Sequence, residues 1–250
     1  MAERRKAAHP ITPEYLRAQG GFASFPTVKT GYSPSGAWTH RYDVWTSRGI
    51  VEHGIELLGS IQLKRRTGGP GQRFTLEVVQ ELTSDRGVTN RLTAQMQCKE
   101  DELASPVSWR LTSEHRIGDT AVRPPVDFSE TAIVTPGKLN IKRGNETLLR
   151  PVPARFTGCW NLIEAVQRLK FGARRPISFN LLEGLTRVKG EMESSYDGTY
   201  SFDVGGGPLN THRFVQIGRG ILPYEYSVDD HHRVLLVITF CKAYILKEAG

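Results

Sequence analysis

The chain lacks the local signatures of the common catalytic and metal-binding classes. It has no GxSxG nucleophile elbow, no HExxH helix and no Walker motif, and the glycines of GGGP (205–208) lack the strand-to-helix setting of a phosphate loop. Its 3 cysteines, Cys98, Cys159 and Cys241, are widely spaced without a CxxC pair. We therefore expect no metal, no cofactor, and buried thiols in preference to a disulfide. An enzyme is disfavoured but stays open, because lyases on β scaffolds use scattered Tyr, His and Arg side chains.

Long apolar runs and a recognisable leader are also missing. No apolar stretch approaches the roughly 18 residues of a membrane-spanning helix, which predicts a soluble chain. The opening residues, MAERRKAAHP, are charged and lack the apolar h-region of a signal peptide. They fit either a cytoplasmic protein or an exported one whose leader is not part of this sequence.

Charge of one sign is in excess, with 33 Lys and Arg against 26 Asp and Glu, a formal charge of +7. A basic protein favours acidic partners such as anionic lipid, anionic glycan or nucleic acid. Nucleic acid is disfavoured, because the strands lack the paired aromatic and basic motif of RNA-binding sheets. Arginines at 41, 91, 110 and 116 alternate onto polar faces, and Lys64-Arg65-Arg66 falls at a strand end. We interpret these as a basic outer wall, either solvated or in contact with anionic lipid or polysaccharide.

What the sequence does contain is a period of two. Val88, Leu92, Ala94, Met96 and Cys98 share one face of a segment whose other face is polar, which is typical of a half-buried strand. The same alternation and the turn signals between segments predict an antiparallel meander over 38–45, 50–63, 74–82, 88–98 and 107–112, with a hairpin loop at 46–49.

The second half predicts one helix and further strands. A proline-rich excursion over about 118–156 holds one or two short strands near 132–141. An apolar stripe through GCWNLIEAVQRLKFG predicts a helix over about 158–170, ended by Gly172. Strands are then expected over 176–189, 196–204, 211–218, 221–228 and 233–247. The sum is an all-β fold with minor α: an antiparallel, strongly curved sheet or barrel with one packed helix. We expect an N-terminal extension over 1–37 and a single domain over 38–250.

The end of the chain raises two further points. Both faces of RVLLVITFCKAYILK (233–247) are apolar, so we expect the barrel interior to cover one face and the helix or an apolar ligand the other, with a homodimer interface as the alternative. Just before it, Asp229-Asp230-His231-His232 could pass for a metal site. An extended stretch would send these side chains to opposite faces, so we predict an ordinary turn.

A family resemblance rests on two stretches, RPVPARFTGCWNLIEAVQRLKFG and PYEYSVDDHHRVLLVITFCKAYIL. A helix followed by a return through paired strands resembles the curved, incompletely closed barrels of bacterial cell-envelope proteins, among them the lipoprotein carriers of the outer-membrane localisation pathway. The resemblance implies an apolar cavity capped by helices, acyl chains or another hydrophobic ligand within it, and a periplasmic or extracellular location. This chain is longer than the carriers, so carriage of lipoproteins is not transferred to it.

Strand alternation places several titratable residues on apolar faces. His40 shares a face with Trp38 and Tyr42, and a regular hairpin would bring His53 near Tyr42 or Val44. His115 and Glu183 fall on apolar faces of their own segments. His40, Tyr42, His53 and Glu183 are therefore candidate acid–base residues. The candidate ligand-binding residues are Trp38, His40, Tyr42, His53, Trp109, His115, Trp160, Phe240 and Tyr244. The structural alternative is that these histidines bond main-chain carbonyls or Tyr hydroxyls within the core.

Three functions follow from these observations. The first is a binding or carrier protein for an apolar or amphiphilic ligand in a barrel cavity, at an anionic envelope surface. The second is a polysaccharide lyase or hydrolase for an acidic glycan, in which a basic cleft neutralises the uronate and His and Tyr move protons. The third is a structural or assembly protein that uses the final strand as an interface.

Overall fold

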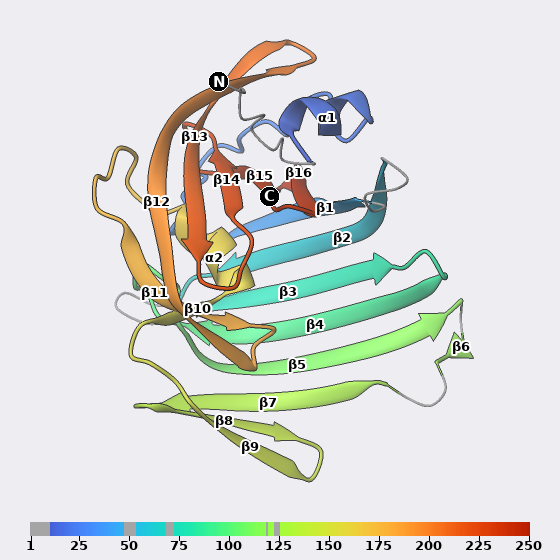
Figure 1. The fold of residues 1–250 in the computed structure, drawn as a ribbon, viewed down its shortest axis with the longest axis vertical. Coiled ribbons are helices and arrows are strands. Elements are labelled where there is room, and N and C mark those ends of the chain that lie inside the picture. The colour runs from blue at the N-terminus through green and yellow to red at the C-terminus, as the bar shows by residue number, and fades with distance from the viewer. Residues whose placement is uncertain (1–10, 48–53, 69–72, 119, 123–125) are drawn as a thin grey trace, which may run out of the picture.

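The computed structural model describes residues 11–47, 54–68, 73–118, 120–122 and 126–250 (Figure 1). The N-terminal half contains α1 (Pro13–Ala18), β1 (Trp38–Ser47), β2 (Ile55–Arg66), β3 (Phe74–Thr83), β4 (Val88–Cys98), β5 (Pro106–Ile117) and β6 (Thr120–Ala121). The middle contains β7 (Phe128–Thr135), β8 (Lys138–Arg143), β9 (Glu146–Pro151), β10 (Phe156–Gly158) and α2 (Cys159–Val166). The C-terminal part contains β11 (Ile177–Glu183), β12 (Arg187–Val204), β13 (Gly207–Gly218), β14 (Tyr224–Val228), β15 (Val234–Ile238) and β16 (Lys242–Ala249).

These strands form one continuous, strongly curved sheet. Its order is β10-β11-β12-β13-β14-β15-β16-β1-β2-β3-β4-β5-β7-β8-β9, with β6 beside β5. Neighbours are antiparallel, except for the parallel pair of β10 and β11. Because β16 pairs with β1, the last strand of the chain joins its two halves. The sheet ends at β10 on one side and β9 on the other, so it is an incompletely closed barrel. The predicted all-β fold with minor α is confirmed.

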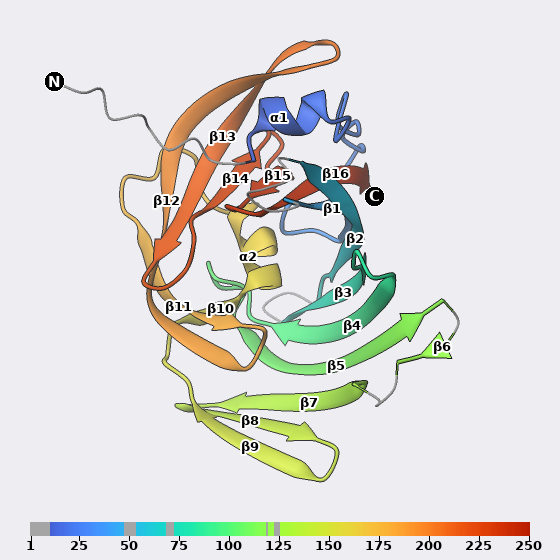
Figure 2. The ribbon, with the colours of Figure 1, turned by 45° about the vertical axis from the view of Figure 1, so that its right-hand side comes forward.

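Helix α2 lies in the hollow of this sheet, between the C-terminal strands and β1–β5 (Figures 1 and 2). The strands turn their apolar faces toward it with the period that the sequence shows. On β1, Trp38, Tyr42 and Val44 are buried together with His40, while Arg41 between them is exposed. One core cluster therefore runs from β1–β5 through α2 to β11–β15.

The N-terminal segment covers the outer face of the last strands. Thr12 caps α1, where its hydroxyl accepts a hydrogen bond from the Tyr15 N–H at 3.2 Å. Leu16 of this helix is fully buried. A second core cluster joins this segment to the outer side of β12, β15 and β16; it consists of Ile11, Leu16, Phe22, Phe202, Leu236, Ile238, Ala243 and Ile245. Both faces of the final strands are covered as expected, but the outer cover is residues 11–22, and neither the predicted helix nor a ligand.

Two of the predicted strands are hairpins. The strand expected over 233–247 is wrong, since β15 and β16 pair antiparallel around a turn in which Thr239 Oγ1 accepts the Lys242 N–H at 3.1 Å. This run contains no Gly, Pro, Asn or Asp, so the turn left no sequence signal. The turn also shifts the faces, because Ala243 joins Ile238 on the outer side. The strand expected over 176–189 is likewise broken, at Gly184, where Glu183 pairs with Arg187.

Three other boundaries differ from the predictions. Helix α2 ends at Val166, because the main-chain bonds change to i−3 partners and Gln167 Nε2 takes the Ile163 carbonyl at 3.1 Å. The hairpin loop predicted at 46–49 is longer, since Ser47 still pairs with Ile55. The proline-rich segment holds the two-residue strand β6 and the three longer strands β7–β9 of the main sheet, in place of one or two.

Candidate functional site

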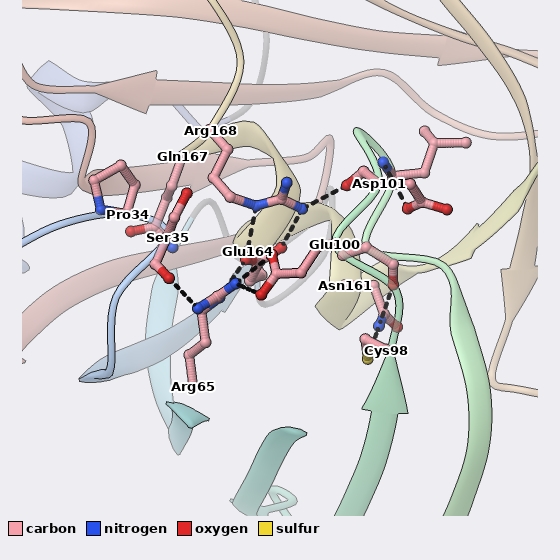
Figure 3. A network of polar contacts seen from close by, with 12 residues as sticks. Pro34, Ser35, Arg65, Cys98, Glu100, Asp101, Asn161, Glu164, Gln167 and Arg168 are labelled. Carbon is pink, nitrogen blue, oxygen red and sulfur yellow. Dashed lines mark hydrogen bonds and ion pairs between the residues drawn. The ribbon is translucent and has the colours of Figure 1, made fainter. Parts of the chain in front are cut away.

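A buried network of charges surrounds α2 in the hollow of the sheet (Figure 3). Arg65 of β2 is fully buried, and its Nε donates to Glu164 Oε1 of α2 at 2.8 Å. Arg168 donates from Nε and Nη2 to both Glu164 oxygens at 2.9 Å. The other end of Arg65 holds Glu100 at 2.5 and 2.6 Å and stacks 4.2 Å from the centre of the Phe74 ring. Every charge in the network therefore has an opposite partner, as buried charges require.

The carboxylate of Glu164 is the centre of this network. Burial raises its pKa, while the hydrogen bonds and positive charges of Arg168 and Arg65 oppose that rise. Removal of either guanidinium would leave a buried carboxylate with one partner fewer, which is costly in a low-dielectric interior. The network thus fixes α2 to β2 by directional bonds that an apolar contact would not supply.

The same region ties down the loop of residues 99–105 between β4 and β5. Asn161 Nδ2 donates to the Ala104 carbonyl at 3.0 Å, Thr157 Oγ1 to the Leu103 carbonyl at 2.6 Å, and Arg168 Nη2 to the Asp101 carbonyl at 2.8 Å. Ala104 has a φ of 51°, a left-handed conformation that costs energy in a residue with a Cβ. The loop folds inward and, with α2, fills the hollow of the sheet.

The three cysteines are free. Cys98 is buried, its Sγ accepts a hydrogen bond from Asn161 Nδ2 at 3.2 Å, and burial raises its thiol pKa. Burial also raises the pKa of Cys159, to about 11. Both stay protonated and unreactive at neutral pH. The expectation of buried thiols is wrong for Cys241, which is exposed in the β15–β16 turn.

Three of the predicted site residues do come together. His40 stacks on Trp38 with ring centres 4.5 Å apart and lies 5.7 Å from Tyr32 on the same measure, while Tyr42 Oη lies 3.4 Å from His40 Nδ1. His40 and Tyr42 are fully buried and Trp38 is nearly so. Burial, assisted by the positive charge of Arg233, lowers the pKa of His40 to about 3. The imidazole is therefore neutral at physiological pH and packs as a core side chain.

Trp109 and His115 have other partners. Trp109 is buried, and its Nε1 donates to Glu130 Oε1 at 3.1 Å. His115 is half-buried near the end of β5, where its Nε2 lies 2.9 Å from Asn90 Nδ2 and its Nδ1 lies 3.5 Å from Asp127 Oδ1. None of these contacts joins Trp109 or His115 to the cluster of Trp38, His40 and Tyr42.

The remaining predicted residues are scattered. Trp160 and Tyr244 are half-buried against the main core, and burial raises the pKa of Tyr244 to about 12. Phe240, a candidate ligand-binding residue, is in the β15–β16 turn and 45% exposed, because the predicted single strand is a hairpin.

Two of the predicted site residues remain, Glu183 and His53. The bulge at this end of the β11–β12 pair is in β12, where Gly190 and Glu191 stand opposite Asn180 alone. Glu183 is half-buried at the end of β11 and pairs with Lys189 at 2.9 Å. His53 lies outside the described residues, and Ile61 occupies the position opposite Tyr42. The proximity of His53 to Tyr42 or Val44 stays a prediction.

The Asp229–His232 stretch forms the predicted turn between β14 and β15. Asp229 Oδ1 accepts the N–H groups of His231 and Arg233 at 3.0 and 2.8 Å, and its carboxylate pairs with the Arg233 guanidinium. His232 and His212 are both parallel to the Phe171 ring, with centres 4.1 and 3.6 Å away. Two rings so close to one centre must lie on opposite sides of it. Within the described ranges no group of three or more His, Cys, Asp or Glu residues is placed to hold a metal ion.

The predicted basic wall is of mixed charge. Arg41, Arg91, Arg110 and Arg116 are exposed as expected. However, Arg91 lies between Glu81 and Glu114 on the neighbouring strands. The prediction is wrong for Arg65, which is fully buried although the Lys64–Arg66 run was assigned to the surface. Arg65 lies on the same face of β2 as the buried Ile61 and Leu63, and this spacing of two was the sequence signal that places it inside.

A pocket of about 490 Å³ opens where the chain passes from the β9 end of the sheet to the β10 end. Its walls come from the start of β5, the β7–β8 turn and the segment after β9, and are mainly apolar: Pro106, Val107, Val134, Pro136, Val152, Pro153, Ala154 and Phe156. Two exposed cations, Arg73 and Lys99, also line it, and the described residues that line it include no carboxylate. This volume is typical of small-molecule sites.

A second pocket, of about 690 Å³, lies between β11, β12 and β13. Its lining includes Glu191, Glu193 and Arg155, the last paired with Glu102. Of its large apolar members, Phe179 and Met192 are at most 3% exposed, and Ile217 alone is exposed. The 490 Å³ pocket is therefore the better candidate for a ligand site, because its walls are mainly apolar and its described lining has two cations and no carboxylate. Sequence analysis missed it, since its residues come from five separate stretches of the chain.

Comparisons with known proteins bear on the fold alone. No protein-family model matches the chain, and no curated protein matches it. Among solved structures it is similar to a β-barrel-like protein of the domain of unknown function DUF1849 from Brucella abortus, with a TM-score of 0.54 and 11% sequence identity over 86% of this chain and 97% of that one. The likeness supports a barrel-like fold. Among the described residues, no helix is long and apolar enough to cross a membrane.

Proposed function

We propose that the protein binds an anionic amphiphile, with its apolar part in the 490 Å³ pocket and its acidic group beside Arg73 and Lys99. The observation that carries this proposal is the lining itself, apolar on most sides with two cations and no described carboxylate. Each methylene removed from water contributes about 0.8 kcal/mol, so the apolar walls supply most of the affinity. The cations select for a negative head group.

The position of the pocket supports the same function. It borders Val152 and Phe156, which are 5% exposed and belong to the main core, so an inserted chain would extend that core. The hollow of the sheet, by contrast, holds α2 and the charged network. We therefore place the ligand at the opening of the barrel and not along the Trp38–His40–Tyr42 cluster.

The lyase alternative has no comparable support. Acid–base catalysis needs groups that titrate near neutrality at an accessible site. His40 is fully buried with a pKa near 3, and Glu183 is paired with Lys189.

Titration with a dansylated medium-chain fatty acid and its methyl ester tests the proposal. Saturable binding of the acid is expected, and Val107→Trp, which fills the pocket, should abolish it. Val79→Trp, on the outer face of β3, is the matched control and should bind as the wild type does. Absence of saturable binding by the wild type, or equal binding by both variants, would overturn the proposal.

Charge selectivity is tested separately. Replacement of both Arg73 and Lys99 by Gln should weaken binding of the acid roughly two- to thirtyfold, because an exposed ion pair contributes about 0.2–1 kcal/mol. Binding of the ester should be unchanged. Arg91→Gln with Arg110→Gln, on the outer face, removes the same net charge and should leave both affinities as they are.

A further inference from the structure

The two ends of the sheet differ in how they are protected. All three residues of β10 are buried, and Thr157 within it is bonded to the 99–105 loop. At the other end, every residue of β9 except Leu148 is exposed, and β8 is its only partner strand in the described sheet (Figures 1 and 2). A sheet edge of this kind presents unpaired N–H and C=O groups that favour strand addition.

The turn before β9 decides which main-chain groups are unpaired. Arg143 and Glu146 close a two-residue turn at Gly144 and Asn145, with a φ of 57° at Gly144, so they form a hydrogen-bonded pair. Hydrogen-bonded and non-bonded pairs then alternate along the strand. The N–H and C=O groups of Thr147 and Leu149 therefore point away from β8, toward the open edge.

The sequence of β9 is complementary to itself in one antiparallel register. Two facing residues of an antiparallel pair both point their main-chain groups toward the partner strand or both point them away from it. Along β9 these two orientations alternate with residue number, so in a symmetric pair an odd-numbered residue must face an odd-numbered one. The two-fold axis therefore passes through a residue. An axis at Leu148 sets Glu146 opposite Arg150 of a second copy, twice, and pairs Thr147 with Leu149. An axis at Thr147 or Leu149 pairs neither charge with its opposite, and the latter also places Pro151, which has no N–H, in the ladder.

We propose that β9 is an interaction surface for a second copy of this chain, joined antiparallel about Leu148 into one continuous sheet. The pairing adds main-chain bonds at Thr147 and Leu149 and two Glu146–Arg150 pairs. It also brings the two Leu149 side chains, each 64% exposed in the single chain, to diagonal positions about 7–8 Å apart. Six-residue strands bury little surface, so the dimer is weak and reversible.

Sedimentation over a range of protein concentrations tests the pairing by charge. Glu146→Arg should raise the dissociation constant about tenfold, and the swap Glu146→Arg with Arg150→Glu should restore it to within about threefold of the wild type. Glu114→Arg, on the exposed face of β5, is the matched control and should have no effect. A dimer that ignores Glu146→Arg, or a swap that fails to restore it, would overturn the proposal.

Disulfide capture tests the register even when the dimer is weak. Facing residues of a non-bonded antiparallel pair have Cα atoms about 4.5 Å apart, within reach of a disulfide. In a Cys241→Ser background, Leu148→Cys should therefore yield a covalent dimer on mild oxidation, and Thr147→Cys, which faces Leu149 of the second copy, should yield far less. Equal yields, or no covalent dimer from Leu148→Cys, would refute it. Neither experiment depends on the pocket or its ligand.

Discussion

Acid should destabilise this protein through His40. The imidazole is stacked with the rings of Trp38 and Tyr32, with Tyr42 at its edge. Its pKa is lowered by burial and, to a smaller extent, by the positive charge of Arg233. The folded pKa is about 3, against 6.5 for an unperturbed histidine. The folded pKa is depressed, so the neutral ring stabilises the protein fully above pH 6.5, and this contribution is lost as the pH falls toward 3.

The size of the effect follows from the two pKa values. Each pH unit within this window costs about 1.36 kcal/mol of stability, because the unfolded state binds a proton that the folded state does not. Between pH 7.5 and pH 5 the loss due to His40 is therefore about 2 kcal/mol. Few carboxylates titrate over this range, so the histidine term should stand out.

Urea unfolding at pH 7.5, 6 and 5 measures it. His40→Phe keeps the stacked ring and removes the titration, so its free energy of unfolding should fall by about 2 kcal/mol less than that of the wild type over the same range. Tyr42→Phe removes the same side-chain contact but keeps the imidazole, and its pH dependence should match the wild type. If His40→Phe and the wild type lose equal stability, the buried neutral histidine is not the cause.

Two further substitutions test the packing described above. Glu164→Gln removes the buried carboxylate that Arg65 and Arg168 share, and should cost about 3–5 kcal/mol in urea unfolding. Glu248→Gln, in an exposed pair with Arg41, should cost less than about 1 kcal/mol, and comparable losses would contradict the assigned role of the network. Leu16→Ala should lower the free energy of unfolding by about 2–5 kcal/mol, because Leu16 of α1 is fully buried. Leu222→Ala, at an exposed leucine, is the control and should be nearly neutral. A small effect at position 16 would mean that the N-terminal cover contributes little to stability.

Alternation along single strands was readable from the sequence because it is a local property. In β1 it placed Trp38, His40 and Tyr42 on one buried face, and in β4 it placed Arg91 on the exposed face, since side chains alternate across a strand. The turn at Asp229 was also readable, because short acidic side chains bond their own main chain. The curved all-β architecture followed from the same pattern.

Everything that depended on distant partners required the folded chain. Arg65 looked like a member of a surface charge run, and its burial is compensated by Glu100 and by Glu164, which lie 35 and 99 residues away in the chain. The turn at Thr239 is set by pairing between β15 and β16 in a run without turn residues, and Glu183 is held by Lys189 of the neighbouring strand β12. The pocket and the open β9 edge arise where the two ends of the sheet fail to meet, because closure is a property of the whole sheet and of no single segment.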